Sequence, residues 1–262
     1  MWDISDRDSP ALTAELPIGT RYIFPVAYAP AGDVLATGAT DTSIQLWDTK
    51  DPRHPRPMGA PLTGPTDLIH GVAFSPDGTR LAVTSDDKHV YLYDLPSHTT
   101  TPSMIISDLT PVMQAIFTAD GDTLVVGSGD VSTWDLRGGH PQLIDRDADV
   151  HASTMSLAPG RIIVGTATHH LITYTLDSGH LRNRQAIAPL IATTDTTTTW
   201  QLPQRTPTDD VVVTAGDTTG SIHQQTTDVA TARRWICDTT GELTPAQRSM
   251  YLPHNGIPRE CN

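Results

Sequence analysis

The stretch GVAFSPDGTRLAVTSDDKHVYLYDL, Gly71–Leu95, decides the fold of this chain. It predicts three short strands, over residues 71–74, 80–84 and 89–95, because apolar residues alternate in each and turn residues separate them. Ser75-Pro76-Asp77-Gly78 is typical of a tight turn, since Pro presets φ and Gly tolerates a positive φ. Such a meander has two open edges and too little area to stand alone, so it needs copies of itself as neighbours.

The copies are present. The same order of turns and apolar positions recurs over Pro25–Asp48, Gln114–Leu136, Ser153–Leu176 and, with both turns enlarged, Thr197–Gln225. An aromatic residue near the end of the third strand recurs roughly every 40 to 50 residues along the chain. These aromatic positions are Trp2, Trp47, Tyr93, Trp134 and Tyr174, with Gln225 in the last place. An Asp follows four of them, as Asp3, Asp48, Asp94 and Asp135.

These repeats, over residues 1–225, resemble WD40 repeats, each of which forms one four-stranded propeller blade. The resemblance implies an all-β, WD40-type β-propeller with about five recognisable blades, an incomplete ring of about seven. It also implies structural roles for the recurrent aromatic and Asp residues. Trp2-Asp3 looks like the end of a third strand, so we expect the chain to be the C-terminal part of a longer protein, although a gene that has lost its front is the alternative.

The polar links between repeats are expected to supply outer strands. The candidate segments carry Met, Leu or Ile among turn residues, as a half-solvated strand should. They are Ala11–Leu16, Pro55–Thr63, Pro102–Ser107, Pro141–Asp145 and Arg184–Ala188. By analogy with WD40 topology, we expect each of them on the rim of the next blade.

One departure from the family bears on stability. In WD40 repeats the His of a Gly-His pair bonds an Asp in the second turn, as part of a network with the third-strand Trp. Here Gly64-Pro65 replaces Gly-His, while Asp41 and Asp87 represent the Asp. A buried Asp without its partner must find another donor. We therefore expect an incomplete network and blades that are held mainly by apolar packing.

The pattern changes over residues 226–262, where we predict a C-terminal tail with two short helices. One covers Val229–Cys237, and the other starts at the Thr244 cap and ends near Tyr251. The tail resembles those that close actinobacterial WD40 arrays. Its two cysteines, Cys237 and Cys261, form a disulfide on one reading and remain reduced thiols on the other. A disulfide would place the chain in an oxidising compartment.

Composition supports an all-β chain and narrows its partners. Charged residues make up only 18% of the 262 residues, and 21 Pro and 19 Gly suit many short strands and turns. The net charge of −13 repels phosphate backbones, so nucleic acid is not an expected partner. No apolar run has the length of a membrane helix, and no signal peptide is visible. We therefore expect a cytoplasmic protein, or an extracytoplasmic one if Cys237 and Cys261 are paired.

No motif for catalysis, cofactor binding or metal binding is found. His89 and His169-His170 lie in predicted second turns, and no carboxylate lies beside them at ligand spacing, so we interpret them as exposed turn histidines. Asp145, Asp147 and Asp149 alternate, but they lack the Gly and Glu of a calcium loop. We expect them to form a solvated acidic linker.

Two functional classes remain. The first is a non-catalytic protein–protein interaction scaffold, the binding or sensor end of a larger signalling protein with an ATPase or kinase domain upstream. The alternative is a ligand-binding or hydrolytic propeller of the lactonase or quinoprotein type. An incomplete ring would also expose apolar blade faces and strand edges, which favours self-association. No cofactor is expected, and the partner protein is not identified.

Overall fold

The computed structural model describes residues 1–3, 5–6, 8–18, 23–158, 160–168 and 170–187, and the backbone of 211–215 and 222–226. The described part of the chain is all-β, with twenty short strands and a single 3-10 turn, η1 (Leu95–Ser97). Among the described residues no helix is long and apolar enough to cross a membrane. The predicted tail helices, Cys237 and Cys261 lie outside the described residues.

Four four-stranded antiparallel sheets follow one another along the chain. The first sheet consists of β3 (Ile23–Tyr28), β4 (Val34–Ala39), β5 (Ile44–Asp48) and β6 (Arg56–Pro57). The second consists of β7 (Ile69–Phe74), β8 (Arg80–Ser85), β9 (His89–Asp94) and β10 (Met104–Ser107). The third consists of β11 (Gln114–Phe117), β12 (Thr123–Gly127), β13 (Val131–Asp135) and β14 (Gln142–Asp147). The fourth consists of β15 (Ala152–Ala158), β16 (Arg161–Thr166), β17 (Leu171–Asp177) and β18 (His180–Ile187).

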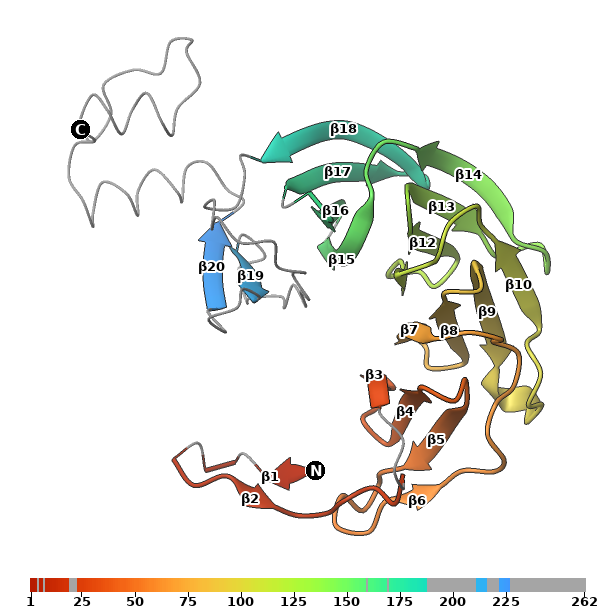
Figure 1. Cartoon of the computed structure of the whole chain (residues 1–262), viewed down its shortest axis with the longest axis vertical. Coiled ribbons are helices and arrows are strands. Elements are labelled where there is room, and N and C mark those ends of the chain that lie inside the picture. Colours follow the sequence, from red (N-terminus) through yellow and green to blue (C-terminus); the bar gives the residue numbers. More distant parts are fainter. Residues whose placement is uncertain are drawn as a thin grey trace.

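Two further pairs of strands flank the four sheets in sequence. β1 (Trp2–Asp3) pairs with β2 (Ala11–Leu12), and β19 (Val211–Ala215) pairs with β20 (Ile222–Thr226), both antiparallel. Strand β19 and most of β20 lie within the last predicted repeat, Thr197–Gln225. The described sheets follow one another around an open arc (Figure 1). The prediction of an all-β propeller architecture is confirmed.

Local chemistry explains the meander of the second sheet. Gly78 has a φ of 71°, and its N–H donates to the Ser75 carbonyl at 2.9 Å, which closes the first turn. Asp77 accepts hydrogen bonds from Ser75 and Thr79, which lower its pKa to about 2. Lys88 closes the second turn with a φ of 72°. These turns fix the register, in which Leu81 lies opposite Tyr93.

The cores of the molecule lie between consecutive sheets. Because side chains alternate across a strand, each sheet has one face toward the sheet before it and one toward the sheet after it. Residues of the first and second sheets share one cluster, and those of the second and third share another. A further cluster joins the third and fourth. Each sheet is thus stabilised mainly by its neighbours.

The prediction that each outer strand lies on the rim of the next blade is wrong. Each outer strand pairs with the third strand of its own repeat and not with the next blade: β6 pairs with β5, β10 with β9, β14 with β13 and β18 with β17. Because the chain reverses soon after each third strand, the free edge of that strand is the nearest place for an antiparallel partner. The following link then carries the chain to the next sheet.

Candidate functional site

One face of the first sheet differs from its counterparts in the rest of the arc. We call it the open face, and its residues are Val26, Tyr28, Leu35, Thr37 and Trp47, which the register places on the same side. The other side of this sheet packs through Ala36 and Ile44 into the cluster shared with the second sheet. The open face is therefore the side that points away from the second sheet.

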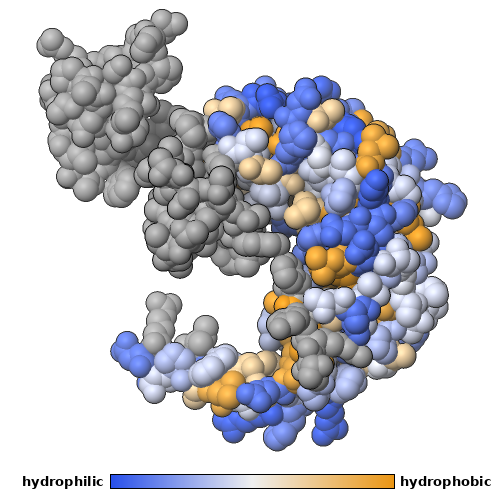
Figure 2. Space-filling model, viewed as in Figure 1, coloured by the Kyte–Doolittle hydropathy of each residue, from blue (hydrophilic) through white to orange (hydrophobic). Residues whose placement is uncertain are grey.

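The inner strand of the open face is exposed. Val26 is 61% exposed and Tyr28 50% exposed, although both are large apolar residues in a strand. The same register positions in the third sheet are Ala115 and Phe117, which are 4% and 5% exposed. Figure 2 shows hydrophobic residues at the surface in this part of the arc. An exposed apolar face of this kind is a candidate binding surface.

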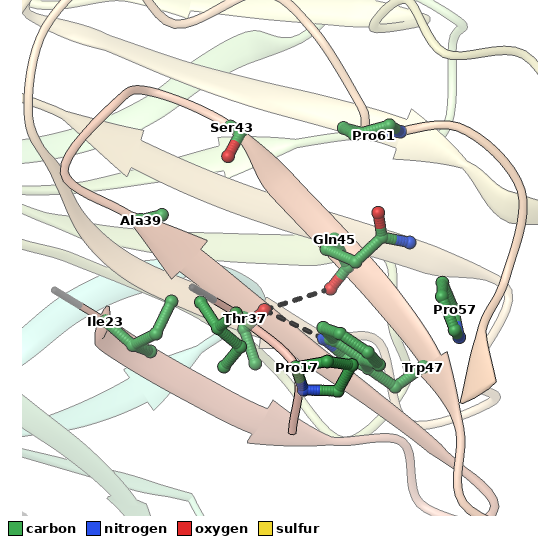
Figure 3. Close-up of a pocket in the computed structure, with 10 residues that line it drawn as sticks. Pro17, Ile23, Thr37, Ala39, Ser43, Gln45, Trp47, Pro57 and Pro61 are labelled. Atoms are coloured by element: carbon green, nitrogen blue, oxygen red, sulfur yellow. Dashed lines mark hydrogen bonds between the residues drawn. The ribbon is translucent and has the colours of Figure 1, made fainter. Parts of the chain in front are cut away.

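The outer part of the open face is hollowed into a cavity of about 170 Å³. The Trp47 ring lies at its base, between Pro17 from the preceding link and Pro57 of β6 (Figure 3). The indole N–H of Trp47 donates to the Thr37 hydroxyl at 3.0 Å, and this hydroxyl donates to the Gln45 carbonyl at 3.3 Å. The lining is completed by Ile18, Ile23, Ala39, Ser43 and Pro61.

The β1–β2 pair, which we call the half-sheet, has the strand register of the outer half of a blade. Trp2 lies opposite Leu12 in the half-sheet, just as Trp47 lies opposite Pro57 in the first sheet. β1 therefore corresponds to a third strand and β2 to an outer strand. Among the described residues β1 pairs with β2 alone. Trp2 is 63% exposed and adds to the apolar surface.

The junction between the first and second sheets shows how the family network is rebuilt without Gly-His. Asp87 accepts hydrogen bonds from the Thr66 backbone N–H at 2.7 Å, from the Thr66 hydroxyl at 3.2 Å and from the Tyr91 hydroxyl at 2.8 Å. Burial opposes the ionisation of Asp87, but these bonds and one from His89 outweigh it and lower its pKa. The expectation of an incomplete network is wrong for this Asp, because Thr66 supplies the missing donor.

Gly64 and Tyr93 hold the same junction together. The Tyr93 hydroxyl donates to the Thr63 carbonyl at 3.0 Å, so the link contacts the second sheet directly. Gly64 has a φ of 152°, and a Cβ there would lie 2.9 Å from the Tyr93 hydroxyl. Only a residue without a side chain fits this approach. Burial raises the pKa of Tyr93, which keeps its hydroxyl a donor.

The other predicted structural residues lie in several separate places. Trp134 donates through its indole N–H to Ser132 at 2.9 Å, within the third sheet. Asp41 accepts from the Ser43 hydroxyl at 2.5 Å in an exposed turn. Asp135 forms an ion pair with Arg137, and Asp48 accepts a hydrogen bond from the Lys50 backbone N–H. Asp3 and Asp94 are exposed. The fold distributes these residues along the arc and does not bring them together into one site.

The acidic run is not a solvated linker, and that expectation is wrong for two of its residues. Asp145 and Asp147 lie in β14 and bond to the fourth sheet: the Tyr174 hydroxyl donates to Asp147 at 2.8 Å, and the Leu181 N–H donates to Asp145 at 3.0 Å. Arg184 also lies 3.0 Å from Asp147. Because the run forms the outer strand of a blade, its alternate side chains reach the next blade. Burial and the Asp147 carboxylate raise the pKa of Tyr174.

Between these carboxylates, Arg146 points to the opposite side of β14. It lies 3.0 Å from Asp130 and 3.8 Å from Asp108, whose side chain is almost completely buried. Burial and the Asp108 carboxylate raise the pKa of Asp130. This cluster links the second and third sheets and is closed to solvent on most sides, so its role is structural.

The turn histidines form no metal site in the described part of the chain. His89 lies 3.3 Å from Asp87, and His170 approaches the Thr168 hydroxyl at 3.3 Å. His169 lies outside the described residues. No group of three or more His, Cys, Asp or Glu side chains among the described residues is arranged to hold a metal ion.

The roles of three residues, Thr66, Val26 and Tyr28, were not predicted from the sequence. The family motif has a His near the position of Thr66, and nothing in the sequence marks Thr66 as the donor that replaces it. Val26 and Tyr28 look like ordinary strand residues, and their alternation gives no sign that nothing would cover them. The available signal was Trp2-Asp3, which resembles the end of a third strand and lies just before the first sheet.

Comparisons with known proteins agree with this architecture. The family model for the WD domain, G-beta repeat, matches residues 26–48 and 58–94, which cover most of the first and second sheets. Small ribosomal subunit protein RACK1y of Oryza sativa subsp. japonica is 28% identical over 130 residues, 45% of this chain and 35% of that protein. Transducin beta-like protein 3 of Rattus norvegicus is 24% identical over 175 residues, 60% of this chain and 21% of that protein.

A third relative, WD repeat-containing protein VIP3 of Arabidopsis thaliana, is 33% identical over 102 residues, 35% of this chain and 32% of that protein. The matched part of the chain thus spans at most 35% of the length of these three relatives. The repeat signatures, the four-stranded sheets and these matches lead to the same conclusion. The first and second sheets of this chain are therefore WD40 repeats.

Proposed function

We propose that the chain is a non-catalytic protein–protein interaction scaffold whose main binding surface is the open face of the first sheet. The observation that carries this proposal is the exposure of Val26 and Tyr28 at positions that are buried in the third sheet. Repeat scaffolds bind other proteins through broad surfaces on a rigid frame. The cavity beside Trp47 adds a recess into which a partner side chain can fit.

Two further parts of the proposal rest on the sequence. The chain serves as the binding or sensor end of a larger signalling protein, as its resemblance to actinobacterial WD40 arrays suggests. We place it in the cytoplasm, as expected from the sequence. The hydrolytic or ligand-binding alternative has no supporting observation among the described residues, so we do not put it forward.

We also propose that the chain self-associates when no partner covers the open face. Exposed apolar residues on a sheet face drive association, because burying them removes apolar surface from water. The net charge of −13 opposes contact between two copies, so salt should strengthen self-association by screening the repulsion.

Site-specific photo-crosslinking in the source cells tests the scaffold function. A photo-reactive amino acid replaces Tyr28 in one version of the protein and Ile105 in another. Ile105 is the matched control, because it is 49% exposed and apolar but lies on the outer strand of the second sheet. We expect a defined protein to be crosslinked from position 28 and not from position 105. Crosslinks that are identical from both positions would contradict the proposal.

A further inference from the structure

Three charged side chains from three different segments meet at the junction of the second and third sheets. Asp108 comes from the link after β10, Asp130 from the turn between β12 and β13, and Arg146 from β14. The Nη1 atom of Arg146 lies 3.0 Å from Asp130, and its Nη2 atom lies 3.8 Å from Asp108. We call these three residues the charge cluster. In it, one guanidinium group faces two carboxyl groups.

The two carboxyl groups of the charge cluster are buried, and their hydrogen bonds are unequal. The side chain of Asp108 is 1% exposed and that of Asp130 is 10% exposed. Asp130 accepts a hydrogen bond from the Ser128 hydroxyl at 3.0 Å. Asp108 accepts one at Oδ1 from the Leu109 N–H at 2.6 Å, but its Oδ2 atom accepts none from any described residue. A buried carboxyl oxygen without a donor disfavours the ionised form of the group.

The charges of the cluster do not balance when both carboxyl groups are ionised, because two negative charges then face one positive charge. Asp147 of β14 adds a further negative charge near Asp130, although it pairs with Arg184. Lys88 and His151 contact the same segments through their backbones, and both are exposed. The excess negative charge therefore stays at the buried junction.

The preceding junction has the opposite electrostatics at the equivalent turn. Asp87, in the second turn of the second sheet, accepts hydrogen bonds from Thr66 and Tyr91, and its pKa is lowered. Asp130, in the second turn of the third sheet, has a raised pKa because of its burial and the facing Asp108 carboxylate. Two neighbouring junctions of the arc should therefore respond to pH in opposite directions.

We propose that the charge cluster is a pH-sensitive latch between the second and third sheets, which holds more tightly when its two carboxyl groups share one proton than when both are ionised. The bound proton removes the excess charge and leaves one carboxylate for the one guanidinium group. Because the folded-state pKa of Asp130 lies above 3.8, the stability that the proton contributes is complete below pH 3.8. It is lost as the pH rises through the raised pKa.

Backbone amides of the link report directly on the opening of this junction. The N–H groups of Asp108 and Val112 donate to carbonyls of the second sheet and its turn, at 2.8 and 3.2 Å. The N–H of Met113 donates to a carbonyl of the third sheet at 3.0 Å. Hydrogen exchange of the full-length protein, followed by NMR and corrected for the intrinsic pH dependence of exchange, measures the protection of these amides.

The central variant is Asp130→Asn, since an amide is neutral at every pH and has nearly the shape of a protonated carboxyl group. At neutral pH we expect it to protect the Val112 and Met113 amides at least about fivefold more than the wild type does, because a buried excess charge is removed. The difference should shrink at mildly acidic pH, where the wild type binds its own proton. No gain at neutral pH, or a gain that persists in acid, would overturn the latch.

Further variants separate the latch from a general effect of removing charge. Asp94→Asn, on an exposed residue of the second sheet, should leave the protection unchanged at both pH values. Asp108→Asn should act as Asp130→Asn does. The double variant Asp108→Asn/Asp130→Asn should lose the gain, because Arg146 is then left without a carboxylate. A double variant that is more protected than either single variant would show that Arg146 does not hold the junction, and the latch would be wrong.

Discussion

The open face of the first sheet and the covered face of the third sheet have equivalent strand positions, but the side chains at these positions are exposed in the first sheet and buried in the third. Val26 and Tyr28 are half or more exposed, whereas Ala115 and Phe117 are almost completely buried. Both pairs lie in the inner strand, and both face the side of the preceding blade. The difference lies in what stands opposite among the described residues: a four-stranded sheet covers the third sheet, while the two-stranded half-sheet precedes the first. Burial in this fold is therefore a property of neighbouring blades and not of the strand alone.

The largest expected effect is a difference in stability loss between a truncation on the covered face and one on the open face. Phe117→Ala should lower the free energy of unfolding by about 3–5 kcal/mol, because it removes a buried aromatic ring and leaves a cavity. Tyr28→Ala should change it by less than about 1 kcal/mol, because half of that side chain is already in water. Urea denaturation at low protein concentration measures both. Equal losses for the two variants would mean that the open face is covered within the isolated chain.

The next effect concerns the rebuilt network at the junction of the first two sheets. Asp87→Ala leaves the Thr66 N–H and the Tyr91 hydroxyl without their acceptor, so it should cost about 1–3 kcal/mol. Asp94→Ala, which alters an exposed Asp of the same sheet, should stay within about 0.5 kcal/mol of the wild type. Thermal melting of both variants checks this. A similar cost for the two would show that the network adds nothing to the junction.

A smaller loss of stability, from removing an indole hydrogen bond, should be the same in the first sheet and in the third. Trp47→Phe and Trp134→Phe each remove an indole N–H that bonds a hydroxyl of the same sheet, Thr37 or Ser132. We expect each change to cost about 0.5–1.5 kcal/mol, because the bond depends on its own sheet and not on a neighbouring blade. Chemical denaturation gives both values. A much larger cost at Trp47 would indicate that the wall of the cavity depends on its indole.

The smallest effect is a pH dependence at the same junction. The folded-state pKa of Asp87 lies below its usual value of 3.8, so the folded state favours the ionised carboxylate. Its contribution to stability is present above pH 3.8 and is lost as the pH falls through the lowered pKa. The stability difference between the wild type and Asp87→Asn should therefore shrink on acidification. A difference that stays constant down to acidic pH would contradict this assignment.

Much of the fold could be predicted from the sequence because its turns are local. Pro76, Asp77 and Gly78 define a turn by their own chemistry, and the recurrence of Trp or Tyr roughly every 40 to 50 residues defines the repeats. The place of the outer strands could not be predicted in this way. It depends on which strand edge is free when the chain reverses, and residue types do not encode that.

The candidate site was harder to predict because it depends on contacts between distant segments. Thr66 and Asp87 are brought together only when the link meets the turn of the next sheet. Asp147 looks like a linker residue until Tyr174 of the following blade donates to it. The open face is defined by the sheet that does not cover it, and no local pattern shows that.

Sedimentation velocity is the most direct test of the central claim that the open face is the surface through which this chain associates with other polypeptides. The wild type, Val26→Asp/Tyr28→Asp and Ile105→Asp would be compared over a range of protein and salt concentrations. The account predicts that the wild type and Ile105→Asp associate with rising concentration, more strongly at high salt, and that the double variant stays monomeric with an unchanged melting temperature. Identical sedimentation of the wild type and the double variant would contradict it.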